Sequence, residues 1–169
     1  EDPTMFPPIP SWDGLHPLVV HFPVALLLVA PIFILIGIFR HKERAYPISA
    51  LILLALGTIG AFVAVATGEA AGELAERNEA INRVLERHEH LAEYTRNAFA
   101  SLTGVFLVLL ATAIFLKERF KPLAWILANV VFVLLYAGAM LLLAKTAHEG
   151  GTLVHQHGVR AMIASSSGS

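Results

Sequence analysis

Four long segments without a charged side chain constrain this sequence more than any other feature. They cover residues 18–39, 48–66, 98–116 and 123–144, and none of them contains Asp, Glu, Lys or Arg. About 20 apolar residues cross the hydrocarbon core of a bilayer as a helix. A soluble bundle would carry charged residues along the outer face of each helix, and here only 15% of all residues are charged. The sequence therefore predicts an all-α integral membrane four-helix bundle with up-down topology.

The spans divide the chain into one domain and two tails. We expect an outer-side N-terminal tail at 1–14, the transmembrane domain at 15–160 and a flexible C-terminal tail at 161–169. The long connection between spans two and three has its own helical pattern, because Leu74, Ile81, Leu85 and His88 recur at helical spacing. It predicts an amphipathic helix on the outer surface that continues into the third span.

The distribution of basic residues predicts the orientation. The two short loops, after spans one and three, carry Arg40, Lys42, Arg44, Lys117, Arg119 and Lys121. Short loops rich in Lys and Arg stay in the cytoplasm. The N-terminal segment has no basic residue, and the long connection is rich in Glu. We therefore expect a multi-pass protein of the bacterial inner membrane, with both termini on the outer, periplasmic side.

Histidines gather on one side of this topology. His41 belongs to an inner loop, but the other seven fall at or near the outer face: His16, His21, His88, His90, His148, His155 and His157. Imidazole binds haem iron and several transition metals. The chain has no Cys, which excludes disulfides, covalent haem attachment through C-x-x-C-H and cysteine-ligated clusters. The pattern predicts a histidine site near the outer membrane face.

His16 and His21 differ in their expected roles. Pro17 suits the first turn of a helix, so His16 could be an interfacial residue alone. His21 lies about 8 Å deeper at 1.5 Å per residue, and an ionisable group there usually faces the bundle interior. Five residues separate them by about 140° on a helix, which disfavours simple chelation of one ion. We expect His21 to point into the bundle.

The third helix offers two competing faces. The His88 face continues through Phe99, Leu102 and Phe106, whereas the His90 face continues through Asn97, Ser101 and Gly104. The second set has the small and polar character of an interior face, and a bend near Thr95 would reconcile the two. We favour His88 as the inward residue and expect His90 to face solvent.

Small residues form a band along span two: Gly57, Gly60, Ala61, Ala64 and Gly68. Such bands commonly allow close helix packing in membranes. Space for a flat macrocycle is the alternative, and we favour packing.

Four stretches resemble one bacterial family. They are "LHPLVVHFPVALL", "ATGEAAGE", "RHEHLAE" and "GGTLVHQHGV", and together they resemble four-span membrane proteins catalogued as a domain of unknown function, family number 2231. The resemblance covers Leu15 to Val159 and implies functional histidines at His16, His21, His88 and His157. The family often has Tyr where this chain has His155. Some relatives are fused to Rieske iron–sulfur domains, which implies membrane electron transfer by analogy.

Haem b is the favoured cofactor, with one or two haems held by His16, His21, His88 and His157 in an electron-transfer protein or subunit. A bare transition-metal ion at the same residues is the second possibility, with His148, His155 and His90 as lesser candidates. A scaffold subunit of a respiratory complex is the third. We assign no catalytic residue. Expected partners are membrane lipid, membrane or periplasmic electron-transfer proteins and a quinone; nothing suggests nucleic acid.

Overall fold

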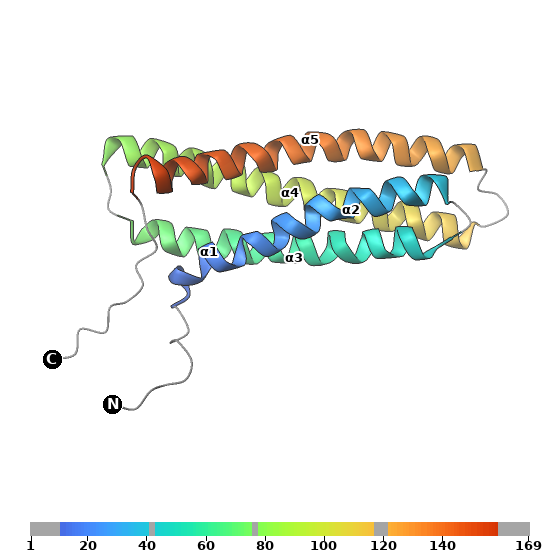
Figure 1. The fold of residues 1–169 in the computed structure, drawn as a ribbon, viewed down its shortest axis with the longest axis horizontal. Helices are drawn as coiled ribbons and strands as arrows, with labels where there is room; N and C mark the ends of the chain where they lie inside the picture. The colour runs from blue at the N-terminus through green and yellow to red at the C-terminus, as the bar shows by residue number, and fades with distance from the viewer. Residues whose placement is uncertain (1–10, 41–42, 76–77, 117–121, 159–169) are drawn as a thin grey trace, which may run out of the picture.

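Long helices running back and forth make up this protein. The computed structural model describes residues 11–40, 43–75, 78–116 and 122–158. A short 3₁₀ turn, η1 (Asp13–Leu15), leads into α1 (His16–Val19) and α2 (His21–Phe39), which together form the first span. The other three spans lie within α3 (Ala45–Glu73), α4 (Glu79–Phe115) and α5 (Pro122–His155). The prediction of an all-α, up-down, four-span membrane bundle is confirmed, with no strand among the described residues (Figure 1).

The helices surround a common centre in chain order. α2 packs on α3, α3 on α4 and α4 on α5, and the ring is closed by α5 against α2. The short helix α1 leans on α3, and its backbone does not come close to α4 or α5. In Figure 1 the first span accordingly crosses the bundle obliquely, from α3 at its start towards α5 at its end. The first span therefore reaches different neighbours at its two ends.

Two of the helices are much longer than a bilayer requires. α4 has 37 residues and α5 has 34, or about 55 and 51 Å at 1.5 Å per residue. The hydrocarbon core is about 30 Å thick. Asn78 caps the start of α4, because its side chain accepts a hydrogen bond from the backbone N–H of Ile81 at 2.9 Å. The amphipathic connection is thus the first part of α4, continuous with the third span as expected.

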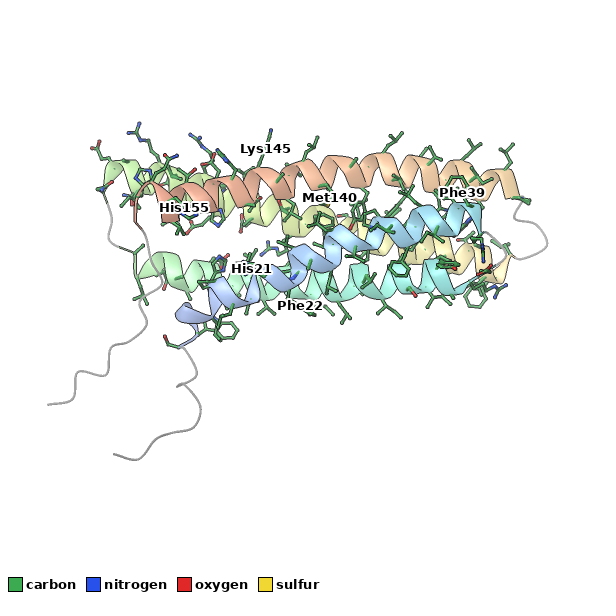
Figure 2. The ribbon with its side chains drawn as sticks, viewed as in Figure 1. His21, Phe22, Phe39, Met140, Lys145 and His155 are labelled. Atoms are coloured by element: carbon green, nitrogen blue, oxygen red, sulfur yellow. The ribbon has the colours of Figure 1, made fainter. Side chains whose placement is uncertain are left out.

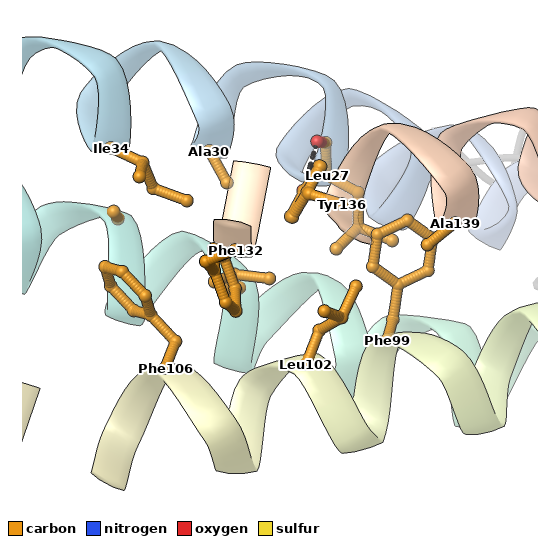
Figure 3. Close-up of a cluster of buried hydrophobic side chains, with 11 residues drawn as sticks. Leu27, Ala30, Ile34, Phe99, Leu102, Phe106, Phe132, Tyr136 and Ala139 are labelled. Carbon is orange, nitrogen blue, oxygen red and sulfur yellow. Dashed lines mark hydrogen bonds between the residues drawn. The ribbon is translucent and has the colours of Figure 1, made fainter. Parts of the chain in front are cut away.

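An aromatic and aliphatic cluster fills the middle of the bundle. Its largest members are Phe99, Phe106, Phe132 and Tyr136, each no more than 2% exposed. Their rings touch in sequence, with centroid separations of 5.4 Å for Phe99–Tyr136 and 4.9 Å for Phe106–Phe132. Figure 3 shows this cluster between the four helices. A smaller cluster of Ile81, Leu85 and Leu153 joins the projecting parts of α4 and α5.

Helix α4, which contains the third span, shows which of its two faces is buried. Phe99, Leu102 and Phe106 are buried, while Asn97, Ser101 and Gly104 are exposed. α4 is one uninterrupted helix, so no bend at Thr95 is needed. The interior therefore follows the His88 line, and the suggestion that the small and polar line faces inward is wrong. On this part of α4 the bulky apolar side chains face the centre, and Asn97, Ser101 and Gly104 lie on the outer surface.

The small residues of span two serve helix packing. An added Cβ at Gly57 would lie 2.8 Å from Leu27, and one at Gly60 would lie 3.1 Å from Pro23. The first span thus approaches α3 more closely than a side chain would allow, as a small-residue band permits. The preference for packing over an empty slot is confirmed at these two positions.

Candidate functional site

Histidines from separate parts of the chain lie at one end of the bundle. We call it the histidine end, and it comprises the start of the first span, the end of α3, the start of α4 and the end of α5. The helices alternate in direction, so both described chain ends, Ser11 and Gly158, also belong to it (Figure 1). The opposite end carries Arg40 and Arg44; the remaining basic loop residues, Lys42, Lys117, Arg119 and Lys121, lie outside the described residues.

His16 is fixed against α3. Its Nδ1 donates a hydrogen bond to the backbone carbonyl of Ala64 at 2.9 Å, and Thr67 Oγ1 lies 3.3 Å from the same nitrogen. The ring lies over Gly68, where an added Cβ would come within 2.9 Å of His16 Cε1. A side chain at position 68 would therefore displace the imidazole.

His88 is fixed against α5 by the same arrangement. Its Nδ1 donates to the backbone carbonyl of Thr146 at 3.0 Å. Its ring lies over Gly150, where an added Cβ would come within 3.0 Å of Cε1. In both cases the carbonyl belongs to one residue of a helix and the glycine follows four residues later, one turn along the same face. Two unrelated helix pairs thus hold an imidazole in the same way.

The hydrogen bonds define which ring nitrogen is free. A backbone carbonyl only accepts hydrogen bonds, so Nδ1 of each imidazole carries the proton. In a neutral imidazole Nε2 then has an unshared electron pair. Both rings are partly buried. The histidine end therefore presents two imidazoles from separate helices, each with an oriented Nε2 that is unprotonated in the neutral ring.

Burial favours the neutral form of His88. This residue lies in the charged part of α4, before the charge-free span. Burial lowers the pKa of His88, while the bond to the Thr146 carbonyl and the negative charge of Glu149 oppose that shift. Glu149 in turn pairs with Arg87 at 3.3 Å. A pKa below the ordinary value of about 6.5 leaves the imidazole uncharged at neutral pH, which is the form that binds a metal.

His21 does not lie where the sequence suggested. Its side chain is exposed, and Nδ1 donates 2.7 Å to the carbonyl of Pro17 in the preceding turn of its own span. Figure 2 shows it near the start of α2, beside the exposed Phe22. The expectation that His21 is buried in the bundle is wrong, and His16 is the inward residue of the pair. Since the span leans on α3 at its start, the face that carries His16 meets that helix.

Three of the other candidate histidines, His90, His148 and His155, are exposed. His157 is half-buried in the turn after α5, where its backbone N–H bonds to the carbonyl of Thr152. Figure 2 shows His155 at the end of α5. Within the described part of the chain, no three His, Asp or Glu side chains are grouped closely enough to hold a metal ion. His16 and His88 are the two candidate histidines whose rings the structure holds against the backbone of a neighbouring helix.

The sequence did not identify the groups that hold the two rings. These are the carbonyls of Ala64 and Thr146 and the glycines one turn further on, Gly68 and Gly150. From the sequence, Gly68 is expected to serve helix packing, and Gly150 belongs to the stretch "GGTLVHQHGV" with no role of its own. The spacing of a glycine four residues after the accepting residue is visible in the sequence, but nothing there shows which carbonyl accepts a distant imidazole.

Comparison with known protein families gives one match. The model of a family described as predicted membrane protein, DUF2231, matches residues 13–162. The chain belongs to the DUF2231 family. Comparison with curated proteins and with solved structures finds no significant match. As a DUF2231 member with four apolar helices, this is a multi-pass membrane protein, and its bilayer-spanning surface contacts lipid.

Proposed function

We propose that this DUF2231 protein binds haem b between His16 and His88 and serves as a membrane electron-transfer protein or subunit. The observation that carries the proposal is the pair of imidazoles whose Nδ1 atoms bond to backbone carbonyls. A metal-ligating histidine almost always donates its other ring N–H to such an acceptor, which fixes the tautomer and the ring orientation. Four-helix bundles commonly build cofactor sites from side chains on facing helices.

The residues fit haem better than a bare ion. Haem brings four ligands of its own, so the protein has to supply at most two axial groups, and imidazole is a usual choice. A tetrahedral metal site needs at least three protein ligands, and the described residues contain no group of three. Two oriented imidazoles therefore meet the requirement of haem more closely than that of a bare ion, which supports the haem assignment. His157, half-buried at the same end, stays a candidate orienting residue.

The protein residues would control the properties of the site. When bound, haem supplies a one-electron iron couple whose potential depends on the axial ligands, the hydrogen bonds to them and burial. The Ala64 and Thr146 carbonyls hold the two imidazoles in the ligating tautomer. Gly68 and Gly150 let each ring lie flat on its helix. The partly buried positions of His16 and His88 limit access of water.

We also propose that the protein lies in a bacterial inner membrane with the histidine end on the outer side. The basic loops at the opposite end support this, because short Lys- and Arg-rich loops remain cytoplasmic. The chain has no Cys, so single cysteines can report the topology. A cysteine in place of Ser11 or Ser166 should react with an impermeant thiol reagent in intact cells. Labelling at Glu118→Cys instead would reverse the orientation.

An optical spectrum of the purified protein, oxidised and then reduced, tests the haem assignment. Expression with adequate haem should give a b-type spectrum, and acid–organic extraction should remove the pigment because no Cys can hold it covalently. His16→Ala and His88→Ala should each lose most of the bound haem. His90→Ala is the matched control, two residues from His88 and exposed, and should keep the wild-type spectrum.

A conservative variant separates ligation from folding. His88→Met retains an axial ligand for haem, and a Met/His pair raises the reduction potential relative to two histidines. We expect His88→Met to keep more haem than His88→Ala and to show a higher potential. A colourless wild-type protein, made with its native partners and enough haem, would falsify the proposed function.

A further inference from the structure

We propose that each chain holds one haem and exchanges electrons at the histidine end alone, so that the protein does not carry electrons across the bilayer. This inference rests on the proposed haem site. It adds the number of haems and the side from which redox partners act.

The candidate site lies at the water-facing edge of the bundle. His88 precedes the charge-free part of α4, which begins at Ala98, by ten residues, or about 15 Å along the helix. Thr146 and Gly150, which hold the His88 ring, follow the charge-free part of α5. Arg87 and Glu149 flank the ring as an ion pair between α4 and α5. A redox group at this level is accessible to a partner on the histidine side.

The middle of the bundle has no room for a second macrocycle. Phe99, Phe106, Phe132 and Tyr136 are 0–2% exposed and form a continuous series of ring contacts. Aliphatic side chains of Leu27, Ile34 and Leu54, each 0–1% exposed, fill the space between them (Figure 3). Protein interiors are packed to the density of organic crystals, so inserting a haem would require the whole centre to open.

In the part of the chain that the structure describes, the middle and the opposite half of the bundle carry no imidazole. Every histidine that the structure describes belongs to the histidine end, and His41 lies outside the described residues. The polar side chains buried deeper are already paired: Thr58 with Thr103 at 2.8 Å, and Tyr136 with the Leu27 carbonyl at 2.6 Å. Among the described residues, electrons that arrive at the histidine end therefore find no second imidazole pair towards the other side.

Reconstituted vesicles test both parts of the inference. Full-length protein is purified with its haem, the haem-to-chain ratio is measured, and the protein is inserted into phospholipid vesicles that enclose ferricyanide. Single cysteines at Ser11 and Glu43, both exposed and at opposite ends, report the fraction in each orientation. A membrane-impermeant reductant is then added outside. We expect one haem per chain, rapid reduction of only the fraction labelled externally at Ser11→Cys, and no protein-dependent loss of the enclosed ferricyanide.

The outcomes separate this inference from the proposed function. Two haems per chain, or consumption of the enclosed ferricyanide in proportion to the protein, would overturn the inference while leaving haem binding intact. Rapid reduction of the fraction labelled externally at Glu43→Cys would do the same. A preparation without haem would instead remove the proposed function on which the inference depends.

Discussion

The packed centre and the histidine end are stabilised by different means. Apolar rings and aliphatic chains fill the centre, and most of its contacts are non-directional. At the histidine end, His16 and His88 depend on single carbonyl oxygens and on glycines that leave space for their rings. In lipid, helices associate through van der Waals packing and interhelical hydrogen bonds rather than through the hydrophobic effect. The centre should therefore determine stability, and the histidine end should determine binding.

Truncating a central ring should give the largest loss of stability. Phe106→Ala leaves a cavity where a fully buried ring contacts Phe132 at 4.9 Å between centroids. Such truncations cost about 3–5 kcal/mol. The free energy of unfolding in mixed detergent measures the cost. The neighbouring Leu107→Ala, at a 53% exposed position, is the control and should cost much less.

The same variant tests whether the two regions are independent. The fraction of Phe106→Ala protein that remains folded should bind as much haem per chain as the wild type. Loss of haem from folded Phe106→Ala protein would show that the centre also shapes the site.

Filling the space beneath His88 should destabilise the protein less than Phe106→Ala does and should affect haem binding more. Gly150→Ala places a Cβ 3.0 Å from His88 Cε1, whereas Gly151→Ala meets no atom within 4 Å. Overpacking costs about 1–3 kcal/mol, while alanine in place of an open helical glycine adds up to about 1 kcal/mol of stability. We expect Gly150→Ala to shift the reduction potential and Gly151→Ala to preserve it. Equal spectra and potentials for the two variants would argue against ligation by His88.

The sequence predicted the fold better than it predicted the site. Charge-free segments identify the spans, because the bilayer core has no water to solvate a charged side chain. Periodicity placed His88 on the same face as Phe99 and Phe106 but did not show whether that face is the inner one, which the burial of both rings decides. Which of His16 and His21 faces inward depended on the helix that the first span packs against at its start. That helix is α3, and the backbone of α1 does not approach α4 or α5. Periodicity gives the angle between two residues but not the helix that each one faces.

A proline in the first span should make one tyrosine hydroxyl important for stability. Pro31 has no N–H, so it cannot bond to the Leu27 carbonyl one turn earlier. The hydroxyl of Tyr136 donates to that oxygen at 2.6 Å (Figure 3). Tyr136→Phe should cost about 1–3 kcal/mol, because it leaves a buried acceptor unsatisfied. Unfolding measurements on Tyr136→Phe, Pro31→Ala and the double variant form a cycle. The cost of Tyr136→Phe should fall in the Pro31→Ala background, and a constant cost would show that the hydroxyl acts otherwise.

Two threonine pairs allow a comparison of the packed centre with the histidine end, one hydrogen bond in each region. Thr58 meets Thr103 at 2.8 Å beside the packed centre, and Thr95 meets Thr146 at 2.9 Å at the histidine end. Interhelical hydrogen bonds in membranes average about 0.6 kcal/mol, so Thr58→Val and Thr95→Val should destabilise the protein by similar small amounts.

Thr58→Val and Thr95→Val should differ in their effects on haem binding. The Thr146 backbone carbonyl holds His88, and loss of its side-chain partner at position 95 should loosen that support. Haem dissociation should therefore be faster in Thr95→Val than in the wild type and unchanged in Thr58→Val. Stopped-flow transfer of haem to a high-affinity acceptor protein measures both rates. Equal rates in the two variants would mean that the His88 site does not depend on the Thr95–Thr146 contact.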